Sequence, residues 1–518
     1  MTLKHSHRVY TCLLISAITV LLSLLPRPAY AHGFGERYDL PVPLYLYLFG
    51  AAAAIVFSFI IIVLFLKAKS VKDDYPRVNL LRWRIFRLLP SPYLTLPIKV
   101  LSVGVFFLVI SAGLFGNQRY DLNIAPTLVW VIWWVGLAYV SALIGNVWSV
   151  LNPWRIIFEW SEKLYRQLGL GDTLSIQRKY PQEWGYWPAF LLFLIFSWIE
   201  LVYSDSSSPL RIAQISLMYS IVTLGGMFIF GKNQWLRYGE AFSVTFGLLS
   251  KFAPTEIRIT SPSTCKECSN LCIDLDNTCL DCIDCFRHAP REKRELNLRP
   301  FAVGLLRNEF VSPSKTIFVV LLLSTVAFDG LTATPVWGKL FNTMFSFLEN
   351  VTLIGTLCLI SLPVLFTMLY ATTCSFMKNL AAIRMPVMGI CQKFIYSLIP
   401  IALAYHLAHF LSYLLIQGQR IIPIASDPFG LGWDLFSTAS FSINIAIVNA
   451  KFAWITAVIA IVLGHMIAVY LAHFIAIRLL RNQQRALNSQ YPMLVLMIAY
   501  TVTSLWIIAQ PIVEHPTG

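Results

Sequence analysis

The chain has 518 residues, of which 57% are hydrophobic and 13% are charged, and its formal net charge is +14. Soluble domains carry about 25% charged residues, so this composition excludes an ordinary soluble fold. Apolar runs of about twenty residues recur along the chain, and this length crosses a ~30 Å hydrocarbon core. The sequence therefore predicts an all-α integral membrane helical bundle of about ten transmembrane helices with a cysteine-rich insert.

The N-terminal segment, 1–31, has the pattern of a signal peptide. Lys4 and Arg8 give it a basic start, an apolar run follows, and the small residues of Ala-Tyr-Ala end at Ala31. Cleavage after Ala31 would leave His32 as the mature N-terminus. We therefore exclude 1–31 from the predicted fold.

The predicted transmembrane spans follow in two groups of five. They lie at 44–66, 96–116, 124–150, 187–204, 211–231, 316–336, 351–372, 393–416, 452–476 and 491–511. The first group belongs to a domain at 32–250 and the second to a domain at 313–518. Residues 251–312 form the predicted metal-binding insert, and 417–451 form the longest loop on the other side of the membrane.

The basic residues are unevenly distributed among the connecting segments. Lys and Arg accumulate in cytosolic loops, and 30 of the 40 lie in alternate connections, at 67–95, 151–186, 232–315, 373–393 and 477–490. This alternation predicts a multi-pass protein of a bacterial inner membrane, with periplasmic mature termini, a periplasmic loop at 417–451 and a cytosolic insert. Because the positive charge marks orientation, we expect membrane lipid and no nucleic acid as a partner.

The insert contains a dense cluster of cysteines. Six of the ten cysteines of the chain lie within 21 residues, namely Cys265, Cys268, Cys272, Cys279, Cys282 and Cys285. Thiols stay reduced in the cytosol, where a disulfide framework is the weaker interpretation. Thiolate clusters of this kind bind zinc or iron–sulfur clusters. The insert is therefore predicted to hold a metal.

The cysteine spacing favours an iron–sulfur cluster and leaves zinc as a rival. The C-x2-C-x2-C run that begins at Cys279 has the spacing of a bacterial ferredoxin motif. A single 4Fe-4S cluster would then have four ligands, namely Cys272, Cys279, Cys282 and Cys285. Alternatively, Cys265 and Cys268 combine with Cys282 and Cys285 into a four-thiolate zinc site without redox chemistry.

A second group of candidate residues lies within the predicted spans. His406 and His409 are three residues apart, so they share one helix face. His465 lies at a comparable depth on the next span, and two carboxylates, Glu200 and Asp329, lie in the outer halves of their helices. Ionisable residues inside a membrane usually face the bundle interior. We predict one polar site with the three histidines as metal ligands and the two carboxylates as candidate catalytic groups.

The chemistry of this intramembrane site stays open at the level of sequence. Three histidines and a carboxylate fit a zinc, copper or iron ion. Two histidines on different helices fit a b-type haem. The same residues fit a proton relay or a quinone pocket, or hydrogen bonds between helices without further function.

Several stretches of the chain resemble one known family. They are Ala31-His-Gly-Phe-Gly-Glu-Arg-Tyr-Asp-Leu-Pro41, Gly145-Asn with Asn152-Pro-Trp-Arg155, Trp198-Ile-Glu-Leu-Val202, Phe328-Asp-Gly with Thr334-Pro-Val-Trp337, Ala404-Tyr-His-Leu-Ala-His409 and Ser426-Asp-Pro-Phe-Gly430. Together they resemble the polytopic membrane proteins labelled fenitrothion (organophosphate) hydrolase. The resemblance implies an inner-membrane enzyme that hydrolyses a phosphotriester, and it brings no set of catalytic residues.

Two classes of function follow, with a third that has less support. The cysteine chemistry favours a redox protein, in which an iron–sulfur insert exchanges electrons with a histidine-lined metal, haem or quinone site and with electron-transfer partner proteins. The resemblance favours a metal-dependent hydrolase whose insert is held by zinc. A metal or small-solute transporter is the third class.

Overall fold

The computed structural model describes residues 38–65, 75–261, 272–273 and 279–514, all within the unit Glu36–Gly518. The predicted signal peptide, His32, Cys265 and Cys268 lie outside the described residues.

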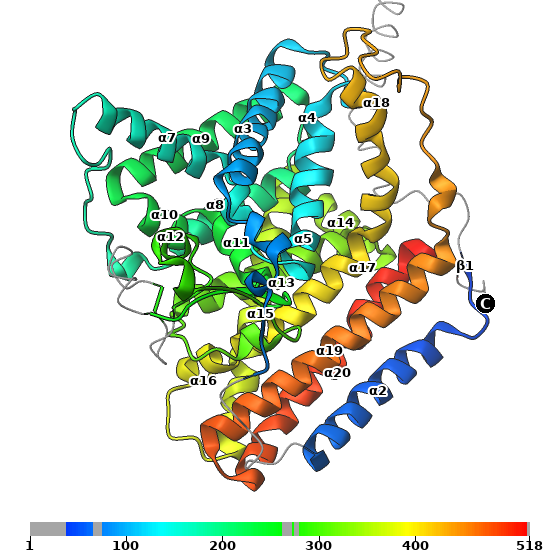
Figure 1. The fold of residues 1–518 in the computed structure, drawn as a ribbon. Helices are drawn as coiled ribbons and strands as arrows, with labels where there is room; N and C mark the ends of the chain where they lie inside the picture. Colours follow the sequence, from blue (N-terminus) through cyan, green and yellow to red (C-terminus); the bar gives the residue numbers. More distant parts are fainter. Residues whose placement is uncertain (1–37, 66–74, 262–271, 274–278, 515–518) are drawn as a thin grey trace, which may run out of the picture. The chain divides into compact units, whose positions relative to one another are not determined.

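Long apolar helices dominate the described chain (Figure 1). Nine of them are long and apolar enough to cross a membrane. Seven are α2 (Leu44–Phe65), α3 (Pro92–Phe115), α9 (Pro209–Phe230), α13 (Pro313–Thr332), α15 (Val351–Leu380), α19 (Ala450–Leu480) and α20 (Gln483–Ile512). The other two are composite, Ile124–Leu143 with α4 (Ile124–Pro126), η4 (Thr127–Gly136) and α5 (Leu137–Leu143), and Val387–Ser426 with α16 (Val387–Phe394), η9 (Ile395–Leu398), α17 (Ile399–Gln417), η10 (Gly418–Arg420) and α18 (Ile421–Ser426). The predicted all-α membrane bundle is confirmed.

The fourth predicted span, at 187–204, is shorter than expected. It forms α8 (Trp187–Leu201), whose 15 residues extend over about 22 Å, less than the ~30 Å hydrocarbon core. This helix packs against α13 and α11 (Ala241–Leu249). The hydropathy pattern did not reveal α11, and seven of its nine residues are buried. The helix α11 thus lies in the interior of the bundle, whereas α8 buries one face and exposes Leu191 and Ile195 on the other.

Capping residues explain where several of these helices begin. Ser312 accepts a hydrogen bond from the backbone of Lys315 and is followed by a proline, a favoured first helical residue. Asn350 caps α15 and Asn449 caps α19 in the same way. These side chains satisfy backbone N–H groups that have no partner within their helices.

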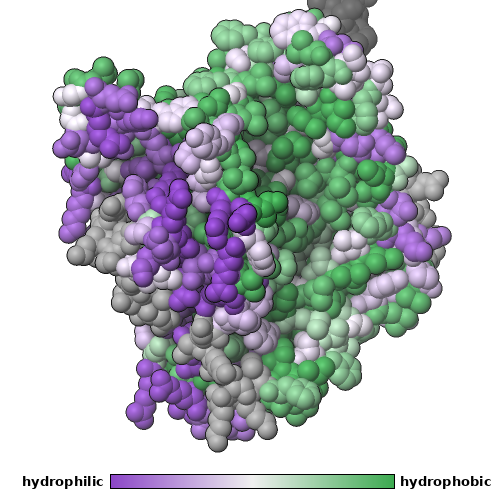
Figure 2. Space-filling model, in the orientation of Figure 1, coloured by the Kyte–Doolittle hydropathy of each residue, from purple (hydrophilic) through white to green (hydrophobic). Residues whose placement is uncertain are grey.

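The surface separates into apolar and polar regions. Figure 2 shows hydrophobic side chains over much of the face formed by α2, α3 and α19, and hydrophilic ones around α7 (Pro153–Gln167) and α12 (Ile283–His288). On α2, Phe57 and Phe65 are 65% and 78% exposed. Contiguous apolar surface of this kind marks contact with another apolar medium, here the lipid.

The cysteine-rich insert contains a small sheet, which the sequence analysis treated as a loop. Its strands are β2 (Val78–Asn79), β5 (Arg294–Leu298), β3 (Thr255–Ile259) and β4 (Cys279–Leu280), antiparallel and in that spatial order. The helix α12 follows β4. The strand β2 comes from the segment after α2, so the insert is built from two distant parts of the chain.

The remaining elements complete the described chain. The strand β1 (Tyr38–Asp39) pairs in parallel with β6 (Val513–Glu514), so both ends of the described chain lie side by side. Three short helices connect the longer ones, namely α6 (Trp148–Leu151), α10 (Lys232–Tyr238) and α14 (Pro335–Leu348). The predicted loop at 417–451 is helical in its first part, through Ser426.

Candidate functional site

Three cysteines of the insert converge on one point. Cys272, Cys279 and Cys285 are buried, and their sulfur atoms all lie within 4.8 Å of one another. The Sγ of Cys272 lies 3.4 Å from that of Cys285 and 3.5 Å from that of Cys279. These distances exceed the ~2.05 Å of a disulfide bond. The predicted cysteine cluster therefore forms a group that could hold a metal ion.

The sheet and α12 bring these sulfurs together. Cys279 begins β4 and pairs with Ile259 of β3, while Ile273 forms a bridge to Cys279 and so carries Cys272 to the same place. Between β4 and α12, Asp281 has a φ of 56°, a left-handed conformation that Asp tolerates better than most residues. This turn directs Cys285 back towards the other two thiols.

The fourth ligand predicted for a 4Fe-4S cluster is not in this group. Cys282 is half-buried and lies outside the set of three, among the residues that the structure describes. Cys265 and Cys268 lie outside those residues. Three of the four predicted cluster ligands are thus brought together.

Two aspartates within the cysteine motif form ion pairs, one inside the insert and one with helices of the bundle. Asp281 accepts from the Nη1 of Arg307 at 3.0 Å. Asp284 forms an ion pair with Arg155 of α7 and lies 3.8 Å from the Nζ of Lys232 of α10. Neither aspartate was predicted from the sequence, although each lies two positions after a cysteine of the motif.

A second ion-pair group lies beside them. Glu309 accepts from the Nζ of Lys251 and of Lys315, each at 2.9 Å, and from the hydroxyl of Tyr396. Burial acts to raise the pKa of Glu309, but the two ammonium groups outweigh it and hold that pKa well below its usual value. Burial lowers the pKa of Lys251 to about 8, against the opposing effect of Glu309.

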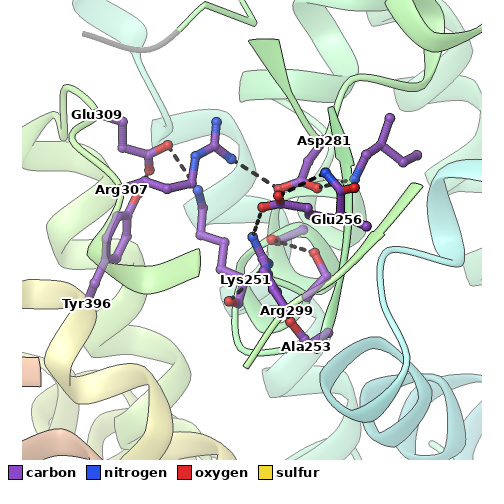
Figure 3. A network of polar contacts seen from close by, with 12 residues as sticks. Lys251, Ala253, Glu256, Asp281, Arg299, Arg307, Glu309 and Tyr396 are labelled. Carbon is purple, nitrogen blue, oxygen red and sulfur yellow. Dashed lines mark hydrogen bonds and ion pairs between the residues drawn. The ribbon is translucent and has the colours of Figure 1, made fainter. Parts of the chain in front are cut away.

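A fully buried pair joins the strands of the insert. Glu256 on β3 lies 2.8 Å from Arg299, and both side chains are 0% exposed. Glu256 also accepts from Arg77 and Tyr75, each at 2.6 Å. Burial acts to raise the pKa of Glu256, but the Tyr75 hydroxyl and the two guanidinium groups keep it lowered. Figure 3 shows Glu256 and Arg299 next to the group of Lys251 and Glu309.

Inside the bundle, a histidine contacts a carboxylate. The Nε2 of His409 on α17 lies 2.9 Å from the Oδ2 of Asp329 on α13, with the two side chains 6% and 21% exposed. Glu200 lies at the end of α8. Two of the predicted candidates, His409 and Asp329, are thus in contact.

An unusual helix forms one wall of this site. The element η4 is a π-helix of ten residues, a rare form that often marks functional sites. Its Trp134 ring centre lies 5.9 Å from that of His406. The hydroxyl of Tyr139 on α5 donates to the carbonyl of Leu407 at 2.6 Å, which fixes this helix against α17.

The other two candidate histidines do not complete a metal site. His406 is buried, and its Nε2 has no hydrogen-bond partner among the described residues. His465 on α19 bonds the carbonyl of Ile461 at 2.8 Å through Nδ1, and its ring lies 5.9 Å from that of Tyr500. Within the described ranges, only the cysteine group brings three ligand atoms within 4.8 Å of one another. The contact between His409 and Asp329 is therefore the feature of the intramembrane candidates that the structure shows.

Comparisons with protein-family models, with curated proteins and with solved structures found no match to this chain. The comparisons thus supply no function. The chemistry has to be inferred from the two sites themselves.

Proposed function

We propose that this protein is a membrane-embedded hydrolase in which Asp329 and His409 form the acid–base pair and the cysteine insert is a structural metal site. The observation that carries the proposal is the 2.9 Å contact between the His409 Nε2 and the Asp329 Oδ2 inside the bundle. Ionisable groups are placed inside a membrane bundle at a free-energy cost, and they mark functional sites by default.

The pair has the chemistry of a general base. A carboxylate only accepts hydrogen bonds, so the Nε2 of His409 carries the proton that it shares with Asp329. His409 can then take a proton from water. In phosphotriester hydrolysis, the water oxygen bonds to phosphorus, its proton passes to His409, and the bond to the aryloxy group breaks with its electron pair on the leaving oxygen. Asp329 stabilises the resulting imidazolium.

Buried polar atoms near the pair support the presence of water. The hydroxyl of Tyr405 and the Nε2 of His406 are buried without a hydrogen-bond partner in the described part of the chain. The ring of Tyr405 lies 6.0 Å from that of His409. A buried polar atom without a partner costs about 1–3 kcal/mol, and ordered water commonly removes this cost. Water is the second substrate of hydrolysis.

An apolar cavity next to this region suits a membrane-dissolved substrate. It has a volume of about 1040 Å³, and Trp133, Phe196 and Tyr139 contribute to its walls. Leu101 and Met218, which also line it, are 67% and 64% exposed. A cavity that opens on the lipid-facing surface favours a lipophilic aromatic ester, in line with the family resemblance.

The sulfur distances support a single metal ion in the insert. Four thiolates at ~2.3 Å around one tetrahedral ion lie about 3.8 Å apart, close to the 3.4 Å and 3.5 Å observed. In a 4Fe-4S cluster each cysteine binds a different iron, which spreads the sulfurs further apart. Thiolates are preferred by soft metals. Cys272, Cys279 and Cys285 would hold zinc, which would stabilise the insert without redox chemistry.

A redox protein is the second candidate function. One iron ion fits the same sulfur distances as zinc, and a single iron held by thiolates can change its oxidation state. In either case we propose that the insert faces the cytosol of a bacterial inner membrane. The insert belongs to the set of alternate connections that hold most Lys and Arg residues, and such residues accumulate in cytosolic loops.

Hydrolysis by purified protein in lipid vesicles tests the proposed function. The substrate is an aryl phosphotriester whose released nitrophenolate is followed by absorbance. We expect D329N to lower kcat about 10²-fold or more, the range for loss of general base catalysis. The control D205N changes an exposed aspartate and should retain full activity. Full activity in D329N, or no hydrolysis by the wild type, would contradict the proposal.

A further inference from the structure

A polar cavity lies between the cysteine insert and the helices. Its volume is about 240 Å³, and its walls include Cys272 and Cys282. Charged side chains converge on it from several elements, namely Arg155, Arg237, Lys251, Asp281, Asp284, Arg307, Glu309 and Lys315. Figure 3 shows four of them, Lys251, Asp281, Arg307 and Glu309. Cations outnumber carboxylates among these residues.

The carboxylates of this cavity already have cationic partners. Asp281 is paired with Arg307, Asp284 with Arg155, and Glu309 with both Lys251 and Lys315. Arg237 differs from these cations, because within the described ranges the structure gives it no ion pair and no hydrogen bond, only the ring of Tyr238 at 5.9 Å. Its guanidinium is exposed at the cavity, and Glu309 acts on it electrostatically from beyond ion-pair distance.

A second, larger cavity gives access from the same side. It has a volume of about 930 Å³ and shares Arg237, Arg307 and Lys315 with the first. Its outer walls add Arg178 and Lys179. A concave surface lined by positive charge raises the local concentration of anions and guides them inward.

We propose that the smaller cavity binds a phosphate-type oxyanion, either inorganic phosphate or the phosphate group of a small ester, with Arg237 as its principal ligand. Guanidinium groups bind such oxyanions through paired, charge-assisted hydrogen bonds. Uncharged polar side chains from Asn146, Asn233 and Ser243 supply further hydrogen-bonding groups in the wall.

This site is separate from the proposed hydrolytic pair. Lys315 of the cavity and Asp329 of the pair are 14 residues apart on α13, or about 21 Å along the helix. A bound oxyanion would connect Arg237 of α10 with Arg307 of the insert. Binding should therefore stabilise the attachment of the insert.

Calorimetric titration of the full-length, metal-loaded protein in lipid nanodiscs tests this inference. Inorganic phosphate and glycerol phosphate are titrated separately, with sodium chloride at equal ionic strength as the blank. We expect at least one of the two to bind and to raise the melting temperature. R237M should weaken this binding about tenfold or more, as expected for the loss of a charge-assisted contact.

The matched control is R166M, which removes an exposed arginine of α7 that lines neither cavity. It should bind as the wild type does. Binding of one ligand alone identifies the source of the phosphate group and supports the inference. If neither ligand binds above the chloride blank, or if R237M binds as tightly as R166M, the inference is overturned. Either result leaves the hydrolysis assay unaffected.

Discussion

The side chains that hold the insert together are charged and buried. Glu256 and Arg299 are fully buried in contact with each other, and Tyr75 and Arg77 satisfy the remaining carboxylate positions. Taking one partner from a buried pair leaves an uncompensated charge, which is strongly destabilising. The insert therefore depends on this pair more than on its exposed ion pairs.

A comparison of two glutamates tests this dependence. We expect E256Q to lower the free energy of unfolding of the insert by about 3–5 kcal/mol. E295Q, which changes a partly exposed glutamate 3.9 Å from Arg258, should lower it by no more than about 1 kcal/mol. Denaturant-induced release of the bound metal measures both. Equal losses in the two variants would show that the buried pair is not the stabilising contact.

Low pH should lower the stability of the insert and of its contacts with the helices. The pKa values of Glu256 and Glu309 are lowered from about 4.5 by their cationic partners, which outweigh burial. A carboxyl with a lowered folded pKa stabilises the fold above its unfolded pKa, and this stability is lost as the pH falls towards the folded value. The melting temperature should therefore drop as the pH decreases below about 4.5.

The variant E309Q distinguishes the protonation of Glu309 from the protonation of other groups as the cause of the loss of stability. Because it removes one of the titrating groups, its melting temperature should fall less steeply below pH ~4.5 than that of the wild type. Lys251 acts with the same sign at higher pH, since its pKa is lowered to about 8 and stability rises as the pH increases above that value. A wild-type melting temperature that does not respond to acid would contradict the assignment.

Single residues were only partly predictable from the sequence. Asp329 and His409 stand out because ionisable groups are rare in apolar spans, and the structure brings them into contact. The partners of Asp284 were not predictable, since Arg155 is 129 residues away and the pairing depends on tertiary packing. The three predicted histidine ligands do not converge with a common spacing of ligand atoms in the described ranges, and the ring centre of His465 on α19 lies 5.9 Å from that of Tyr500.

At the scale of elements, hydropathy located the long helices and missed the short ones. A span of about twenty apolar residues is a strong signal, and nine of the ten predicted spans form helices of that length. The nine residues of α11 are too few to give this signal, and their burial comes from contacts with α5 and α8. The hydropathy profile does not distinguish a π-helix from an α-helix, so the π-helical form of η4 was not predictable from it.

The sheet of the insert was also beyond the sequence pattern. Its strands have two to five residues, and β2 pairs with β5 across more than 200 positions of the chain. Such short strands carry no clear alternation of polar and apolar residues. The cysteine spacing was enough to predict a metal-binding element, but the sheet that orients the thiols was not predictable from it.

At the scale of the whole molecule, one helix links the two candidate sites. The helix α13 is the most buried of the candidate spans, with 72% of its apolar window inside the protein. It begins beside the Glu309 group, where Lys315 lies, and ends beside His409, where Asp329 lies. The insert and the intramembrane pair are therefore at opposite ends of a single rigid element.

The choice between hydrolysis and electron transfer depends on the metal of the insert. A single zinc ion leaves the acid–base pair as the reactive centre, whereas an iron–sulfur cluster would make the insert itself redox-active. The described cysteine group could hold a metal ion, and we propose that this is a single zinc ion.

X-ray absorption at the metal edge, on protein purified without oxygen, tests this most directly. We predict one zinc ion per chain, a single shell of sulfur ligands at about 2.3 Å and no scattering from a second metal. Iron accompanied by inorganic sulfide and by metal–metal scattering would contradict the structural role of the insert.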